Sequence, residues 1–264
     1  MAKSASKTSA LKAKPGPKVE APAESDDPVG PIEIKRARYE RFRIWVVGDT
    51  PLICNAWSHK AKEEMLGKQL GRIRPGREKR DPQTDFENSL YEMGEGSGQY
   101  GFPATGFKKA LLAVAHKDKG VPRTAVMASL WIDHEIISVR PALAGARCNM
   151  PLLRIWGSKP EMREDMTKIG VGLRRTANLT YRAEFFHWAF LVTGRYNADV
   201  LSLEALGFLA EEAGLSTGLG EWRNERSGVF GAFHVADPAE AEAWYKFRAG
   251  KGPMPTPAPD KMAA

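Results

Sequence analysis

The chain has 264 residues, and 42% of them are hydrophobic, which is enough for one sizeable core or at most two small ones. Its 39 Lys and Arg residues outnumber 32 Asp and Glu residues, and this formal charge of +7 is compatible with a polyanionic partner. The two cysteines lie far apart and the five histidines are scattered, so we expect no disulfide framework, no metal site and no cofactor. No apolar run could span a membrane and no secretion signal is visible, so we predict a cytoplasmic protein.

Composition divides the chain into three parts. Residues 1–31 are rich in Ala, Lys, Pro, Ser and Glu and have few large apolar side chains, so we expect a disordered arm. Residues 32–250 are expected to fold, and residues 251–264, which contain four prolines, to form a flexible tail. Within the folded part, residues 58–100 are polar and charged and are predicted to be a partly helical insertion. Connections of this length usually carry function or mobility.

Strands and helices are predicted to alternate along the folded part. The predicted strands lie at 40–48, at 129–139 as one strand or a bent pair, in 168–193, and at 229–235. The predicted helices follow a loop at Gly101, with Thr105 as N-cap and Phe107, Leu111, Leu112 and Val114 as apolar positions, and lie at 202–213 and 238–248. Ser202 is the expected cap of the second helix, and Gly214 is expected just beyond its end. This order indicates an α+β fold and is compatible with a split βαβ, ferredoxin-like arrangement.

The most informative segment is the glycine-rich stretch 214–235. Gly218 and Gly220 precede Arg223 and Arg226 in a loop between a predicted helix and a predicted strand. Glycine lets a phosphate approach the main chain, and the arginines would add charge-assisted contacts. The loop is neither a Walker A motif nor a dinucleotide fingerprint, because the required lysine and strand-to-helix position are missing. The alternative is a plain glycine-rich turn with exposed arginines.

The pattern G-x-G-x-x-R followed by G-x-x-G-x-F resembles the C-terminal glycine-rich loop of the RAMP superfamily. These are RNA-binding proteins of CRISPR systems, built on ferredoxin-like (RNA-recognition-motif) folds. The segments D-T-P-L-I and G-F-P-A-T-G-F-K-K-A-L are similar to two further motifs of the family, in the expected order over residues 40–236. The second similarity implies that Lys108 and Lys109 face the nucleic acid.

The 58–100 insertion is similar to the thumb of RAMP backbone subunits that polymerise along a guide RNA. Residues 60–80 carry eight basic side chains against three acidic ones, leaving +5 of the chain's excess charge. A basic segment of this kind suits contact with a phosphate backbone, and the alternative is a solvated charged helix. The eight basic residues are Lys60, Lys62, Lys68, Arg72, Arg74, Arg77, Lys79 and Arg80.

Further candidates alternate with apolar residues on the strands predicted in 168–193. Arg174, Arg175 and Arg182 are candidates to line an RNA groove, together with Tyr181. Tyr181, Phe185 and Phe186 are candidates for base stacking, although core packing is the expected fate of both phenylalanines. The tryptophans expected in the core are Trp131, Trp156 and Trp188.

The sequence therefore predicts a protein that binds the backbone of single-stranded nucleic acid. The resemblance implies guide RNA as the strand, self-association along it, and a place among other subunits of a CRISPR-like effector complex. Two alternatives stay open: a phage-type single-strand DNA-binding or annealing protein on the same fold, and a RAMP-type endoribonuclease. The endoribonuclease would need an acid or base. The candidates are His59, His116, His134, His187, Asp81 and Asp85, none of which falls in a recognised catalytic motif.

Overall fold

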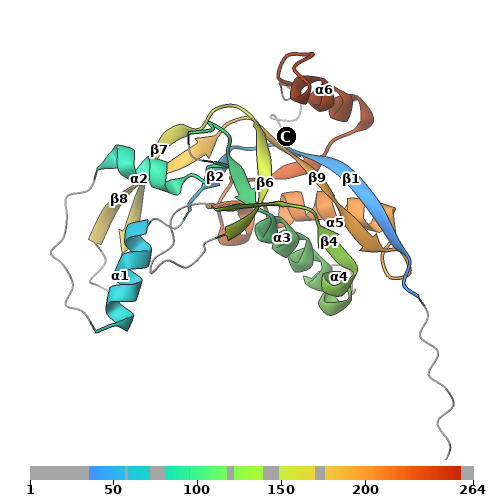
Figure 1. The fold of residues 1–264 in the computed structure, drawn as a ribbon, viewed down its shortest axis with the longest axis horizontal. Helices are drawn as coiled ribbons and strands as arrows, with labels where there is room; N and C mark the ends of the chain where they lie inside the picture. The colour runs from blue at the N-terminus through green and yellow to red at the C-terminus, as the bar shows by residue number, and fades with distance from the viewer. Residues whose placement is uncertain are drawn as a thin grey trace, which may run out of the picture. The chain divides into compact units, whose positions relative to one another are not determined.

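The computed structural model describes residues 36–56, 59–71, 81–94, 96–117, 122–138, 149–169 and 176–256. One compact unit begins at Ala37 and contains every helix and strand of these ranges. The fold is α+β, with helices packed on antiparallel sheets (Figure 1). Within the described ranges, no helix combines the length and the apolar character that crossing a membrane requires.

The larger sheet has four antiparallel strands at its centre. Their spatial order is β10 (Phe233–Val235), β1 (Tyr39–Gly48), β9 (Trp188–Asn197) and β6 (Asn149–Gly157). Three short strands complete the margin: β3 (Gly101–Pro103) and β5 (Glu135–Ser138) pair with β6, and β4 (Leu130–Ile132) pairs with β9. Strand β6 follows β1 in the chain only after several helices and short strands, and it pairs with β9 on the side opposite β1.

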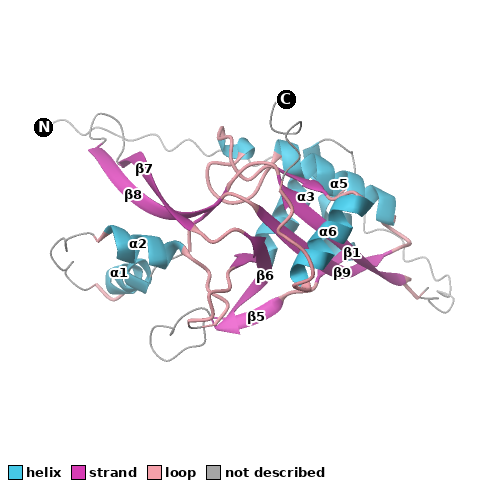
Figure 2. Ribbon diagram, turned by 90° about the horizontal axis from the view of Figure 1, so that it is seen from above, coloured by secondary structure: helices cyan, strands magenta, loops and turns pink. Residues whose placement is uncertain are grey.

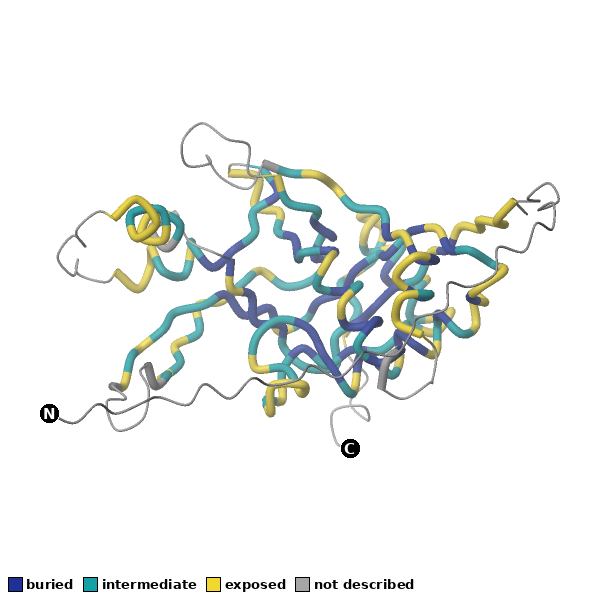
Figure 3. Tube along the Cα trace, turned by 90° about the horizontal axis from the view of Figure 1, so that it is seen from below, coloured by how far each residue is buried: buried dark blue, intermediate teal, exposed yellow. Residues whose placement is uncertain are grey.

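Helices cover the two faces of this sheet unequally. Along one face lie α3 (Ala104–Lys117), α4 (Arg123–Ser129) and α5 (Leu203–Ser216), whereas α6 (Pro238–Arg248) lies on the other (Figure 1). Alternation along β1 explains both contacts, since successive side chains of a strand point to opposite faces. Phe42 and Val46 join the main core with residues of α3 and α5, while Trp45 and Val47 pack with Trp244 of α6. Figure 3 shows the buried segments gathered where helices meet the sheet.

The smaller sheet is built around a long hairpin. Its strand order is β2 (Leu52–Cys54), β8 (Thr176–Phe185) and β7 (Glu161–Ile169). Figure 2 shows β7 and β8 as two long neighbouring strands. The predicted insertion supplies two helices, α1 (His59–Gln69) and α2 (Pro82–Ser89). The carboxylate of Asp81 caps α2 by accepting from the backbone N–H of Thr84 at 2.9 Å. At the other end of α2, the Ser89 hydroxyl accepts from the backbone N–H of Ala183 in β8 at 2.8 Å.

Several predicted elements are confirmed, because their signals are local. The strand at 40–48, the bent pair within 129–139 and the helix at 238–248 are all present. The Ser202 hydroxyl caps α5 by accepting from the N–H of Ala205 at 3.0 Å. The four apolar positions predicted on α3 are all buried. Five elements were not predicted: the short strands β2 and β3, the longer strands β6 and β7, and α4.

Other predictions are wrong, and the reasons are tertiary. Gly214 does not end α5 but lies buried within it. Glycine is required there because a Cβ would stand 1.7 Å from the carbonyl oxygen of Phe233. Thr105 is not an N-cap, since α3 already begins at Ala104. The strand predicted at 229–235 is shortened to three residues by the turn at Gly231, where φ is +69°.

The burial predicted for the aromatic side chains is confirmed for some of them and wrong for others. Trp188 and Phe185 are buried as predicted, and Trp156 is half-buried. Phe186 and Trp131 were expected in the core but are 44% and 54% exposed. Trp131 points away from the helices because its strand neighbours Leu130 and Ile132 occupy the core-facing positions.

Candidate nucleic-acid interface

The glycine-rich loop joins α5 to β10 and contains a short 3-10 turn, Asn224–Arg226. Gly218 and Gly220 have φ values of +69° and +76°, in the region that favours glycine. A Cβ on Gly220 would stand 2.4 Å from the carbonyl oxygen of Ile53, to which the backbone N–H of Glu221 donates at 3.0 Å. This glycine therefore lets the loop approach β2, and a backbone carbonyl already occupies the space beside it.

The two arginines of the loop differ. Arg223 donates through Nη1 to the carbonyl oxygen of Gly220 at 3.1 Å and through Nη2 to Glu225 at 2.8 Å. Arg226 is exposed and forms no ion pair with the residues that the structure describes. Arg223 thus stabilises the loop through internal contacts, while the charge of Arg226 is not paired within the described residues.

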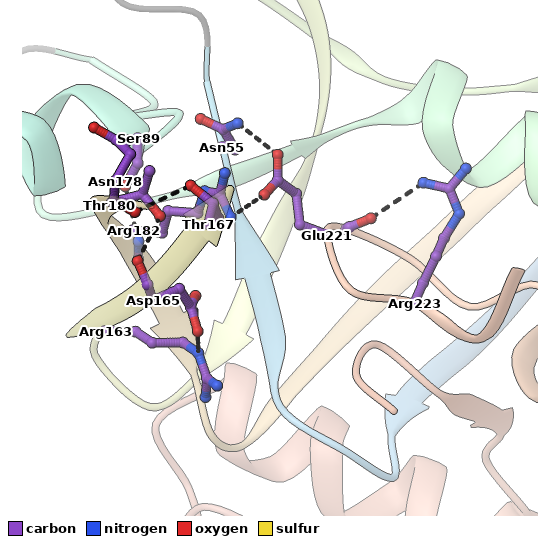
Figure 4. Close-up of polar contacts among 12 residues, drawn as sticks. Asn55, Ser89, Arg163, Asp165, Thr167, Asn178, Thr180, Arg182, Glu221 and Arg223 are labelled. Carbon is purple, nitrogen blue, oxygen red and sulfur yellow. Dashed lines mark hydrogen bonds and ion pairs between the residues drawn. The ribbon is translucent and has the colours of Figure 1, made fainter. Parts of the chain in front are cut away.

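A cluster of polar side chains fastens the same loop to the smaller sheet (Figure 4). Glu221 accepts from Asn55 and forms an ion pair with Arg182, each at 2.5 Å. Arg182 lies directly opposite Arg163 in the register of β7 and β8. Like charges in this position repel, but each guanidinium has its own carboxylates, and Arg163 contacts Asp165 at 3.0 Å and Glu184 at 2.9 Å. The guanidinium of Arg182 is therefore paired with the carboxylate of Glu221 within the protein.

Two neutral groups lie close to this cluster and are held in their protonated forms. Burial, followed by the negative charge of Glu221, raises the pKa of Cys54 to about 12. Burial raises the pKa of Tyr91 to about 12 as well, with smaller contributions from Cys54 and Glu221. The cluster around Glu221 thus combines paired charges with unreactive neutral groups. This combination is expected of residues that stabilise the contact between the loop and the smaller sheet.

The lysines at the start of α3 also divide between two environments. Lys108 donates from Nζ to the carbonyl oxygens of Met127 at 3.0 Å and Leu130 at 2.5 Å, and burial lowers its pKa. Lys109, one residue further along α3, is exposed. Lys108 therefore joins α3 to the end of α4, and Lys109 is the better placed of the two for an external anion.

The remaining predicted residues lie mainly outside the described part of the chain. Lys62 is half-buried on α1 and has an internal partner. The roles predicted for the others stay predictions: the side chain of Lys60, and all of Arg72, Arg74, Arg77, Arg80, Arg174 and Arg175.

A cationic surface that the sequence reasoning missed lies on the larger sheet. Arg41 of β1 faces Arg195 of β9 in register, and Arg195 faces Trp131 of β4 on its other side. Directly opposed residues in antiparallel strands point to the same face, so these three side chains form one row, with Arg43 next along β1. We call Arg41, Arg43, Arg195 and Trp131 the arginine row. All four side chains are exposed.

Two properties distinguish the arginine row from Arg223 and Arg182, the paired arginines in and beside the loop. None of its three arginines forms an ion pair or hydrogen bond with a side chain in the described ranges. The row also belongs to the face that carries α6, but it begins where that helix no longer covers the sheet, beyond Trp45 and Leu191. The alternation R-F-R-I-W at 41–45 signalled one half of this surface in the sequence, whereas the other half requires the strand register.

Comparison with known proteins finds a similarity in structure and no match in sequence. No family model matches the sequence, and no curated protein matches it. Among solved structures, the chain is similar to a chain of the cryo-EM structure of the Type III-B Cmr-beta bound to cognate target RNA. The TM-score is 0.37 and the sequence identity 12%, and the match covers 75% of this chain and 59% of the other.

Proposed function

We propose that this protein binds single-stranded nucleic acid across the open part of its larger sheet, mainly through phosphate groups. The observation that carries the proposal is the arginine row, whose exposed arginines have no carboxylate partner among the residues that the structure describes and stand beside an exposed tryptophan. Guanidinium groups match phosphate geometry with two parallel donors, and each neutralised phosphate releases condensed counterions. A polyanion is therefore the ligand class that this surface favours.

Repulsion inside the row strengthens this argument. Arg41 and Arg195 are directly opposed across two strands, where like charges destabilise a sheet. In the smaller sheet, the opposed pair Arg163 and Arg182 is neutralised by internal carboxylates. An external phosphate placed between Arg41 and Arg195 would provide the missing negative charge.

Trp131 favours a single strand over a duplex. Its indole is 54% exposed and lies beside Arg195, so an unpaired base could stack on the ring while the arginine contacts the adjoining phosphate. Bases in a duplex are already stacked and paired, and they present no free face to such a ring. We propose RNA as the strand because the loop and helix motifs resemble those of RNA-binding RAMP proteins.

The finer assignments follow from the same resemblance. The antiparallel order β10-β1-β9-β6, with α3 and α5 in the two crossings, supports a ferredoxin-like core. The predicted insertion carries the exposed side chains Met65 and Leu70 at α1, which support a contact with a second copy along the strand. We therefore propose a backbone subunit of an effector complex, with the 58–100 segment as its reaching part.

The experiment is a binding titration with a labelled single strand, followed by fluorescence anisotropy at several salt concentrations. Arg41→Ala and Arg195→Ala should each lower the affinity about tenfold or more, because a charge-assisted contact contributes about 1.5–3 kcal/mol. The slope of log affinity against log salt should fall by about one for each variant. Arg38→Ala is the matched control, since Arg38 is exposed beside the same strand but already paired with Glu40. Equal affinity for Arg41→Ala, Arg38→Ala and the unmodified chain would contradict the proposal.

One observation favours a second candidate function, cleavage of the bound RNA. His134 lies beside the row, with its ring centroid 5.9 Å from that of Trp131. Its Nδ1 contacts the carbonyl oxygen of Ile132 at 3.0 Å, and because a carbonyl only accepts, that nitrogen carries the proton. In the neutral ring, Nε2 is then a base positioned near any 2′-OH on the row. Cleavage products that end in a cyclic phosphate, and that disappear in His134→Asn, would establish this activity.

A further inference from the structure

Two more guanidinium groups converge on a single indole ring at the border of α6. The Cζ atom of Arg154, on β6, lies 4.0 Å from the ring centroid of Trp156, and the Cζ atom of Arg248 lies 5.6 Å from the same centroid. Arg154 and Trp156 are two residues apart on one strand and therefore share a face. Arg248 comes from the last turn of α6. Sheet and helix each supply one cation to the same ring.

This face of β6 is the face that carries the arginine row. Trp156 is opposite Ala189 in register, and Ala189 is opposite Val47 of β1. Alternation along β1 then places Val47, Trp45, Arg43 and Arg41 on one side of the sheet. The indole with its two arginines and the arginine row therefore lie on the same side of the sheet, at the margins of the area that α6 covers.

The position of Arg248 is set in advance by the packing of α6. Trp244 stacks on Trp45 with ring centroids 5.8 Å apart, and Phe247 packs edge-on against Trp244 at 5.8 Å. At the other end of the helix, His234 contacts Asp49 at 2.7 Å and Glu240 at 2.8 Å. A helix fixed at both ends holds its final arginine at little further entropic cost on binding, which is the advantage of preorganisation.

The charges of the two arginines are only partly compensated. Within the residues that the structure describes, neither arginine forms an ion pair, and the carboxylate of Glu135 acts on Arg154 without direct contact. Burial lowers the pKa of Arg154, Glu135 counteracts this, and the nearby positive charge of Arg248 lowers it again. The indole quadrupole attracts each cation but does not remove the repulsion between them. An anion held by both guanidiniums would remove it.

We propose that Arg154 and Arg248, held over Trp156, bind one phosphate of the strand and extend the arginine row to the end of α6. This inference rests on the proposed function, because the phosphate belongs to the same strand. The ring of Trp156 already carries two cations, so it positions arginines and does not stack on a base. Since sheet and helix then share one phosphate, binding of the strand also stabilises the docking of α6.

The test is Arg248→Ala, measured by anisotropy with a series of single strands of increasing length. Strands long enough to reach α6 from the arginine row should bind about five- to tenfold more weakly, with a salt slope lower by about one. Strands too short to reach it should bind as they do to the unmodified protein. Lys246→Ala is the matched control, because Lys246 is exposed on the same helix and paired with Glu242 at 2.8 Å. It should leave all affinities unchanged.

The other outcomes separate this proposal from the previous one. Unchanged binding of Arg248→Ala at every length, with weaker binding of Arg41→Ala, overturns the phosphate site alone. Unchanged binding of both variants overturns the proposed function as well. A loss that Arg248→Lys does not partly restore, and that accompanies a lower melting temperature, would assign Arg248 to packing. Equal Arg248-dependent binding of polyglutamate would identify an acidic protein segment as the occupant.

Discussion

The glycine-rich loop and the arginine row present the same residue type in opposite electrostatic settings. In and beside the loop, Arg223 is paired with Glu225 and Arg182 with Glu221, so their charges are used within the protein. In the row, Arg41 and Arg195 face each other, and the described part of the chain contains no carboxylate that pairs with them. The difference teaches that an arginine in a promising motif is not yet a phosphate ligand. What matters is whether its charge remains uncompensated after folding.

The glycines of the loop illustrate the same lesson for the backbone. A cradle for phosphate and a close contact between two chain segments both require glycine, and the sequence signature is identical. At Gly220 the contact is with the main chain of β2. Arg226 is the arginine of the loop that is exposed and has no ion pair among the described residues, so its proposed contact with a strand stays a prediction.

The largest expected effect separates packing from binding at the loop. Gly220→Val should lower the free energy of unfolding by about 2–5 kcal/mol, because the side chain would clash with a backbone carbonyl and resist a positive φ. Gly67→Val is the control, since a Cβ at that helical position meets nothing within 4 Å. Chemical denaturation measures both variants. A Gly220→Val protein that is as stable as the unmodified one but no longer binds a strand would restore the phosphate-cradle interpretation.

A pair of glutamates sharpens the comparison within the loop itself. Glu221→Ala should destabilise the protein by about 1–3 kcal/mol, because it leaves the 15%-exposed Arg182 side chain without its partner. Glu225→Ala should cost less than about 1 kcal/mol, because its partner Arg223 is 30% exposed, twice as much as Arg182, and water can solvate the guanidinium once the pair is lost. Thermal melting of the two variants side by side is the measurement. Equal losses of stability in the two variants would mean that the cluster around Glu221 does not stabilise the contact between the loop and the smaller sheet.

Substitution of Trp131 tests whether the row reads bases or phosphates alone. Trp131→Ala should weaken single-strand binding by about 1–2 kcal/mol, within the range for base–aromatic stacking, and leave the salt slope unchanged. Trp131→Phe should retain part of the affinity because it keeps an aromatic face. Folding should be unaffected, since the side chain is 54% exposed. If the alanine variant instead lowers the salt slope as Arg195→Ala does, the indole only positions its neighbour.

The last expected effect is confined to a range of pH and concerns α6, which borders the row. Hydrogen bonding to Asp49, and then to Glu240, raises the pKa of His234 to about 9. Because this value lies above that of an unfolded histidine, the stabilisation is complete below about pH 6.5 and disappears as pH rises through about 9. The melting temperature of the unmodified protein should therefore approach that of His234→Gln between these values. A constant difference across the range would contradict the pairing.

Much of the fold was predictable from local patterns. The strand at 40–48, the capped start of α5 and the helix at 238–248 depend on alternation, capping and helix-start signals within a few residues. Gly214 was misinterpreted because a helix-ending glycine and a glycine that admits a neighbouring strand look alike in sequence. Strands β6 and β7 were not predicted, because their sequences mix apolar and polar residues and these segments become strands only by pairing with their neighbours.

The sequence by itself determined the balance of charge, the glycine-rich loop, and the alternation that puts Arg41, Arg43 and Trp45 on one side of a strand. Only the tertiary structure decided which arginines remain available. Arg41 meets Arg195 and Trp131 because β1, β9 and β4 pair in one register, and residues far apart in the chain become neighbours. Arg182 and Arg223 lose their availability for the same reason, since folding brings carboxylates within ion-pair distance. Electrostatic interactions depend on distance in space, and distance in space is what the linear order of residues leaves open.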